Sequence, residues 1–173
     1  MGAVVTEYSP KRTADDLRLA IWKDRAFPVD PVTMAKTLGI QVLETTLPEK
    51  VSGAIIKRTG QSPIIVVNRA DSRNRKRFSI AHELGHYVYK MLYNGNDDTA
   101  FEWIDYRDVS SSAGTDKEEV FANRFAANLL MPEKPVTDEA KRTGRNAILL
   151  ALYFGVSAEA INIRLKDLDI HNR

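Results

Sequence analysis

The feature that most constrains this chain is the segment from His82 to His86, which reads H-E-L-G-H and contains the pattern H-E-x-x-H. On an α-helix, residues four apart lie on the same face, so the two histidines point the same way. Two imidazole nitrogens at this spacing can bind one metal ion at about 2.0–2.1 Å. Glu83 follows His82 directly and is placed to accept a proton from a water molecule that the metal activates. The pattern therefore predicts a helix that carries a metal site and a general base.

An ordinary amphipathic helix is the alternative explanation of the same stretch. Ile80, Leu84 and Val88 form an apolar stripe opposite the histidines, as on any helix that packs against a core. This explanation leaves two histidines and a glutamate crowded on one face without a function. The chain has three histidines in all, and two of them lie here. We therefore favour the metal site.

A catalytic zinc ion needs a third protein ligand. The chain has no cysteine, and the remaining histidine, His171, lies at its very end, so we expect a carboxylate. The best source is a predicted helix over residues 117–132, which Pro132 ends because proline disfavours the helical conformation in the residue before it. This helix begins with two adjacent carboxylates, Glu118 and Glu119.

The residue one turn further on favours Glu119 over Glu118. Asn123 lies one turn after Glu119, and its side-chain oxygen can accept the outer N–H of a ligating histidine. Ala122 lies one turn after Glu118 and has no such group. The small residues Gly85 and Ala122 also predict that the two helices approach each other closely, since glycine inside a helix costs about 1 kcal/mol relative to alanine.

Two longer motifs resemble the ImmA/IrrE family of metallopeptidases. Residues 75–86 read R-K-R-F-S-I-A-H-E-L-G-H and are similar to the R-R-F-T-x-A-H-E-L-G-H signature of that family. Residues 119–132 read E-V-F-A-N-R-F-A-A-N-L-L-M-P and are similar to its E-x-x-A-N-x-F-A-A-x-L-L-M-P signature. The resemblance extends over roughly 130 residues, and two motifs in the right order make it specific.

The resemblance implies a small gluzincin-type zinc peptidase in which His82, His86 and Glu119 bind Zn²⁺ and Glu83 is the catalytic base. It also implies a protein substrate, since known members cleave repressor-like regulatory proteins of mobile elements or stress responses. We expect the same kind of partner here. An inactive metal-binding scaffold remains an alternative.

The rest of the chain predicts an α+β fold. Residues 13–27 and 31–38 have the apolar spacing of helices, and residues 40–47, 51–57 and 64–67 have the pattern of strands. We expect a small, mostly antiparallel sheet beside the H-E-x-x-H helix, with Asp71 or Ser72 as the N-cap of that helix. Residues 96–115 are polar and rich in turn-forming residues, and we expect a loop there.

The C-terminal part predicts three more helices and a rival function. Residues 136–142, 146–154 and 157–168 read as helices, and the last two resemble a helix-turn-helix. A DNA-binding regulator is therefore the second functional hypothesis. Only Asn162, Arg164 and Lys166 offer groove contacts on the last helix, beside Glu159 and Asp167, so the sequence disfavours DNA binding.

Length and composition agree with one globular domain over residues 1–173, with residues 133–173 as a helical subregion. The composition is 43% hydrophobic and 28% charged, close to the globular average. No apolar run approaches the roughly 20 residues that span a bilayer, and no signal peptide is visible. With no cysteine, we expect a cytoplasmic protein that makes no contact with a membrane.

Overall fold

The computed structural model describes residues 8–94, 103–108 and 117–170. These residues form seven helices and four strands. The helices are α1 (Pro10–Ile21), α2 (Pro31–Thr37), α3 (Arg73–Asn94), α4 (Lys117–Leu130), α5 (Glu133–Thr143), α6 (Ala147–Phe154) and α7 (Ala158–Asp167). The strands are β1 (Gln41–Thr45), β2 (Val51–Lys57), β3 (Ile64–Asn68) and β4 (Trp103–Asp108). The predicted α+β class is confirmed.

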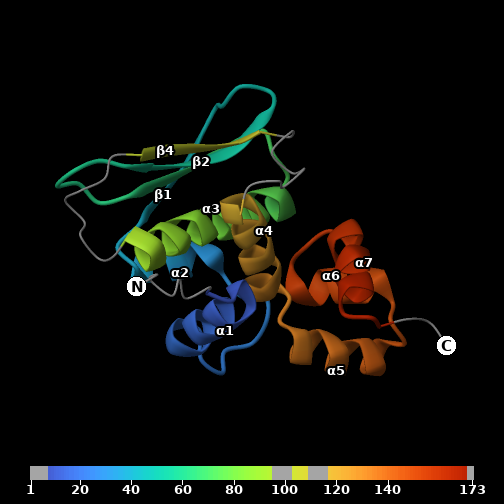
Figure 1. Ribbon diagram of the computed structural model, residues 1–173. Helices are drawn as coiled ribbons and strands as arrows, with labels where there is room; N and C mark the ends of the chain where they lie inside the picture. The colour runs from blue at the N-terminus through green and yellow to red at the C-terminus, as the bar shows by residue number, and fades with distance from the viewer. Residues whose placement is uncertain (1–7, 95–102, 109–116, 171–173) are drawn as a thin grey trace, which may run out of the picture.

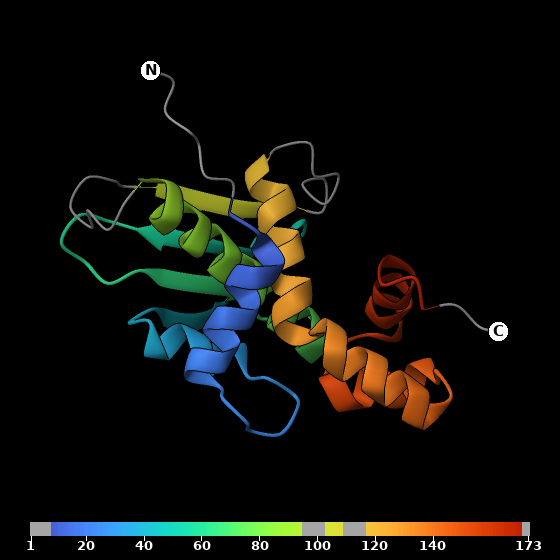
Figure 2. The ribbon, with the colours of Figure 1, turned by 60° about the horizontal axis from the view of Figure 1, so that its bottom comes forward.

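The described helices all lie on one side of the sheet (Figure 1). Helix α3 runs along this face and contacts β2 and β3, while α4 crosses α3 on its other side. Helix α1 lies against α4, and α5 to α7 form a group beyond the end of α4 (Figure 2). Because α3 is held between the sheet and α4, side chains at the α3–α4 crossing are fixed from both sides.

The sheet has the strand order β1-β3-β2-β4. Strand β2 pairs antiparallel with β3 and with β4, so the prediction of a mostly antiparallel sheet is confirmed. Strand β1 pairs parallel with β3, which makes the sheet mixed. The parallel pair arises because β2 and β3 form a hairpin and β1 adds to the outer side of β3. The two edges of the described sheet are therefore β1 and β4.

Strand β4 corrects the prediction that residues 96–115 form a loop. Its register with β2 brings Ile104 opposite Ile56 and Tyr106 opposite Ala54. Strand β4 is stabilised by pairing with β2, which is distant in the sequence. The composition of a short segment does not reveal such a partner. Because the neighbouring residues are polar, the sequence did not indicate this six-residue strand. The rest of the predicted loop falls outside the described residues.

Helix α1 also differs from its prediction, because it begins at Pro10 and ends at Ile21 rather than covering residues 13–27. Ser9 accepts a hydrogen bond from the backbone N–H of Arg12, and proline suits the first helical turn. At the other end, Lys23 has a φ of 58°, so the backbone has left the helix before Pro28 is reached. The other predicted elements are present with small shifts of their ends.

Helices α6 and α7 have the predicted helix-turn-helix arrangement. The side chains of Asn146 and Ser157 cap their N-termini by accepting backbone N–H groups. Gly155, with φ 63°, ends α6 in the left-handed conformation. Among the helices that the structure describes, no single one is long and apolar enough to cross a membrane.

Candidate metal centre

Helix α3 places three of the predicted site residues. It begins where Ser72 Oγ accepts a hydrogen bond from the backbone N–H of Arg75, so Ser72 rather than Asp71 acts as the N-cap. The exposed fractions of His82, Glu83 and His86 are 1%, 0% and 2%. Ionisable side chains that are buried so completely require specific partners.

The α3–α4 crossing is unusually close at one point. A Cβ atom on Gly85 would lie 2.7 Å from the Cα atom of Ala122, a distance that real Cβ atoms do not tolerate. Ala122 is itself fully buried. Only glycine at position 85 permits this separation, and the predicted close approach of the two helices is confirmed.

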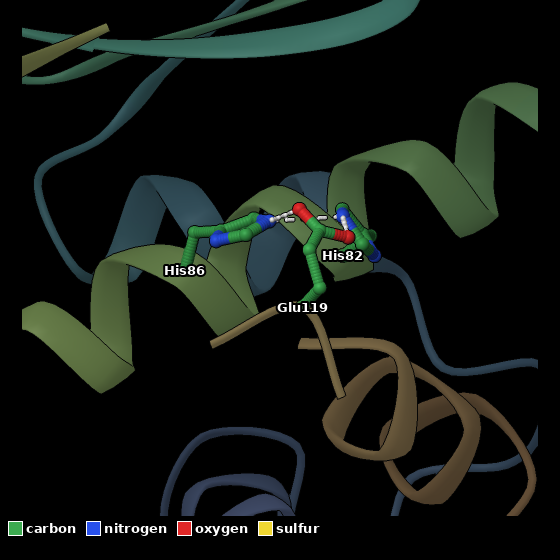
Figure 3. Close-up of side chains that lie close together, drawn as sticks. All are labelled: His82, His86 and Glu119. Carbon is green, nitrogen blue, oxygen red and sulfur yellow. Dashed lines mark hydrogen bonds and ion pairs between the residues drawn. The ribbon is translucent and has the colours of Figure 1, made fainter. Parts of the chain in front are cut away.

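Three ligand atoms converge at this crossing (Figure 3). The Nε2 atoms of His82 and His86 are 3.0 Å apart. Glu119, from the first turn of α4, places Oε1 3.0 Å from His86 Nε2 and Oε2 3.5 Å from His82 Nε2. Two tetrahedral ligands at the usual zinc distances are separated by about 3.3 Å. The described residues thus contain a His82–His86–Glu119 group with the spacing of a zinc site.

The outer nitrogen of each histidine is also held. His82 Nδ1 lies 3.0 Å from Asn123 Oδ1, and His86 Nδ1 lies 2.9 Å from Glu118 Oε1. An ionised carboxylate and an amide oxygen only accept hydrogen bonds, so both Nδ1 atoms are the donors. In a neutral imidazole the Nε2 atom then carries a lone pair rather than a proton. Both Nε2 lone pairs consequently face the centre of the group.

The donor set fits a divalent cation. Two imidazole lone pairs and a carboxylate oxygen repel one another at about 3 Å, and a cation between them removes that repulsion. Glu119 Oε2 is buried and accepts no hydrogen bond from any part of the chain that the structure describes. Two nitrogens and one carboxylate oxygen form a ligand set that suits zinc. Hence the residues present can hold the predicted Zn²⁺.

Glu118 has a part in this site that the sequence reasoning missed. It is no member of the three-atom group, but it bonds His86 and is itself bound by Lys90 Nζ at 2.8 Å. Burial opposes ionisation of its carboxyl group, yet the hydrogen bonds from His86 and Lys90 outweigh burial and hold the pKa of Glu118 below its ordinary value. The sequence could have indicated this role, because each of two metal-binding histidines needs a hydrogen-bond acceptor for its outer nitrogen. The prediction named an acceptor, Asn123, for only one of them.

Glu83 lies under β2. A Cβ atom on Gly53 would be 3.5 Å from Glu83 Oε1 and 3.4 Å from the Cβ atom of Ser79. The missing side chain at Gly53 thus leaves room for the carboxylate between α3 and the sheet. Glu83 follows His82 along the helix but is not part of the donor group.

Arg77, which lies near the motif in the sequence, serves a different purpose. Its guanidinium donates to the carbonyl oxygens of Gly155, at 2.9 Å, and Val29, at 2.6 Å. Burial lowers the pKa of Arg77, against the effect of nearby Asp30. The side chain therefore ties α3 to the turn between α6 and α7 and to the segment before α2.

A helix with H-E-x-x-H, crossed by a second helix that supplies a glutamate, defines a metallopeptidase-like protein. The chain belongs to the peptidase M78 family, since the model described as the IrrE N-terminal-like domain matches residues 35–166. No curated protein sequence matches the chain.

The fold is shared with a solved protein described as a Mycobacterium tuberculosis transcriptional regulator. The two are 19% identical with a TM-score of 0.61, and the match covers 90% of this chain and 46% of the other. The chain therefore spans about half the length of that protein. At this identity, the likeness concerns the fold alone.

Proposed function

We propose that this protein is a zinc-dependent endopeptidase that cleaves a repressor-like regulatory protein. The observation that supports this most strongly is the convergence of His82 Nε2, His86 Nε2 and the Glu119 carboxylate within 3.0–3.5 Å of one another. A buried Glu83 stands next in sequence to one of these ligands. Metal ligands and an adjacent carboxylate are the parts that metal-assisted amide hydrolysis needs.

Each residue has a separate role in this proposal. His82, His86 and Glu119 would hold zinc, which as a Lewis acid polarises a carbonyl and makes water a nucleophile near neutral pH. Glu83 accepts the proton of the attacking water and later delivers it to the leaving amine. Asn123 and Glu118 fix the orientation and protonation of the two imidazoles.

The sheet offers a place for an extended substrate. Strand β4 is the edge next to β2, and β2 carries Gly53 above Glu83. It is therefore the edge nearer to the proposed base. An extended peptide can add to a sheet edge through main-chain hydrogen bonds. We propose that the segment to be cleaved lies along β4, and the family resemblance suggests a repressor-like protein as its source.

DNA binding through α6 and α7 is the alternative. Arg164, the one arginine on α7, is buried and donates to the Met131 carbonyl oxygen and to Asn128 Oδ1. The exposed polar residues of α7 include Asn162 and Lys166 but also acidic ones. An arginine held inside the protein cannot reach a base edge or a phosphate. This observation favours the peptidase over the DNA-binding hypothesis.

Co-expression with repressor-like proteins encoded near the gene tests the proposal. We expect a single specific cleavage of one of them, with little digestion of casein, because a regulatory protease must spare most proteins. Cleavage should stop when His82 or His86 is replaced by alanine. A gel mobility shift on the neighbouring promoter tests the alternative. Sequence-specific DNA binding without any repressor cleavage would refute the peptidase proposal, and rapid casein hydrolysis would refute the narrow specificity.

A further inference from the structure

Helix α6 presents an apolar face to solvent. Its sequence, AILLALYF, contains no charged residue. Leu150 and Phe154 are fully buried. Four other apolar residues of α6 are exposed to solvent: Ile148 (67%), Leu149 (49%), Leu152 (73%) and Tyr153 (39%). Ile148 and Leu152 are neighbours one turn apart, as are Leu149 and Tyr153. At 3.6 residues per turn, the four positions together span about 140° of the helix surface. Single exposed apolar residues are ordinary, but a contiguous group such as this marks an interaction site.

A hollow of about 360 Å³ lies beside this face. Ile148 and Leu152 line it from α6, with Ala151 and Val156 adding further apolar surface. The first turn of α3 contributes Arg73 to the same hollow. The apolar face of α6 thus continues into a depression that can receive a large side chain.

The charged residues that line the hollow are all basic. Its lining includes Arg73 and Arg77 but no aspartate or glutamate. The Arg77 guanidinium is already bonded to two backbone carbonyls. Arg73 is exposed and forms no ion pair with any carboxylate that the structure describes. The surface therefore offers one available positive charge at the edge of an apolar patch.

We propose that this surface, formed by the exposed face of α6 and the hollow beside Arg73, binds an acidic amphipathic helix of another protein. One large apolar side chain of that helix enters the hollow next to Leu152, and a second, one turn away, covers Leu149 and Tyr153. A carboxylate on its flank pairs with Arg73. Helices bind to apolar grooves through anchors at this spacing, and a complementary charge fixes their register.

Other occupants match the surface less well. In a two-fold dimer, a second copy brings the same apolar face and the same hollow, whose lining includes Arg73 but no carboxylate to pair with it. A nucleic acid can pair with Arg73 but leaves four apolar side chains without a partner. Together, α6 and α7 have the length and composition of a membrane span, but they are bent by 101° at their junction. Arg164 and Ile161 of α7 are also buried inside the protein.

The surface is separate from the metal centre but rigidly connected to it. Arg73 and His82 lie nine residues apart on α3, which corresponds to about 14 Å along the helix axis. The proposal goes beyond peptidase activity and does not require it. It holds equally for a protein whose metal site performs no hydrolysis.

Fluorescence anisotropy with a designed probe tests the proposal on the full chain. The probe is a labelled 18-residue helix with leucines four residues apart and flanking glutamates. One control peptide has lysine in place of each glutamate, and a second has serine in place of each leucine. The protein variants are Leu152→Ser and Arg73→Glu, with Leu43→Ser as a matched control because Leu43 is 49% exposed on β1. Circular dichroism checks the fold of each.

We expect the acidic probe to bind the wild type and the Leu43→Ser variant with equal affinity. Leu152→Ser should weaken binding about ten-fold or more, as for an anchor contact. Arg73→Glu should weaken binding of the acidic probe and strengthen that of the lysine peptide. The proposal would be overturned if the wild type bound neither the acidic probe nor the lysine peptide. It would also be overturned if Leu152→Ser and Arg73→Glu both left the affinity for the acidic probe unchanged.

Two further measurements decide between this partner and the other occupants. Sedimentation of the wild type should show a monomer at micromolar concentration. A dimer that Leu152→Ser dissociates would assign the surface to a second copy instead. Vesicles of phosphatidylcholine and phosphatidylglycerol should not bind the protein. Vesicle binding that Leu152→Ser abolishes would assign the surface to a membrane and overturn the proposal.

Discussion

Gly85 on α3 and Ala122 on α4 meet backbone to backbone, so that a Cβ atom on Gly85 would lie 2.7 Å from Ala122 Cα and 3.1 Å from its carbonyl oxygen. This contact sets the distance between the two helices that form the candidate metal centre. Glu119 lies one turn before Ala122 on α4, and Asn123 is the residue directly after Ala122. Both side chains reach the histidines only because the helices touch at this point.

Gly85→Ala should therefore lower both the stability of the fold and the affinity for zinc. Overpacking of a buried contact costs about 1–3 kcal/mol, and the separated helices should bind zinc more weakly. Thermal unfolding and a chelator competition assay measure the two effects. Gly60→Ala is the control for destabilisation alone: the φ of 70° at Gly60 disfavours alanine, but no atom lies within 4 Å of a Cβ there. It should leave zinc affinity unchanged. Equal zinc affinity in the Gly85→Ala protein would show that helix separation does not govern the site.

Glu119→Gln should lose zinc more completely than Glu118→Gln. Glu119 provides a ligand oxygen at 3.0 Å from His86 Nε2, whereas Glu118 acts on the outer nitrogen of His86. Loss of such an outer partner typically weakens metal binding by about 10–100-fold. Chelator competition on the two variants gives the order directly. If Glu118→Gln were the worse variant, the assignment of ligand and supporting residue would be reversed.

Asn123→Ala should weaken zinc binding by roughly 10–100-fold, because His82 Nδ1 loses its acceptor. Asn123→Asp keeps an acceptor oxygen in nearly the same place and should restore much of the affinity. Arg124→Ala is the control, since Arg124 is an exposed neighbour on the same helix. Isothermal titration with zinc would measure all three. A deficit in Asn123→Ala that Asn123→Asp does not reduce at all would argue against the hydrogen-bond explanation.

The pH dependence of folding should reveal the Glu118 interaction in the metal-free protein. Its pKa in the folded state lies below the ordinary value of 4.5. Ionised Glu118 therefore stabilises the fold fully above that value, and the contribution disappears as the pH falls through the folded-state pKa. Urea unfolding of the wild type and Glu118→Gln should show a difference at pH 6 that shrinks towards pH 3.5. A difference that stays constant over this range would contradict the assignment.

The grouping of His82, His86 and Glu119 could be predicted in part from the sequence, because the geometry within each helix is local. The spacing of His82 and His86 on one helix fixes their relative position, and the same holds for Glu119 and Asn123. The interaction between Glu118, His86 and Lys90 joins two helices and depends on their crossing angle, which no spacing reveals. Strand β4 was missed for a related reason, since its hydrogen bonds come from β2, about fifty residues earlier in the chain.

The side chains of Arg77 and Arg164 show a second limit of the sequence. Both arginines have charged neighbours in the sequence, which suggests that their side chains are exposed. On that basis Arg164 was a candidate for contact with DNA. In the structure each is buried and bonded to backbone carbonyl oxygens. Burial of an arginine depends on which carbonyl groups the tertiary fold leaves unpaired. That information is absent from the helix pattern.

The most direct test of the peptidase mechanism compares the wild type with Glu83→Gln on a repressor that the wild type cleaves during co-expression. Both purified proteins should contain one zinc ion per chain and have the same circular dichroism spectrum. Glutamine preserves the shape of the side chain but cannot accept the proton, so the single-turnover cleavage rate should fall by about 10²–10⁴-fold. A zinc-loaded Glu83→Gln protein that cleaves at the wild-type rate would contradict the mechanism.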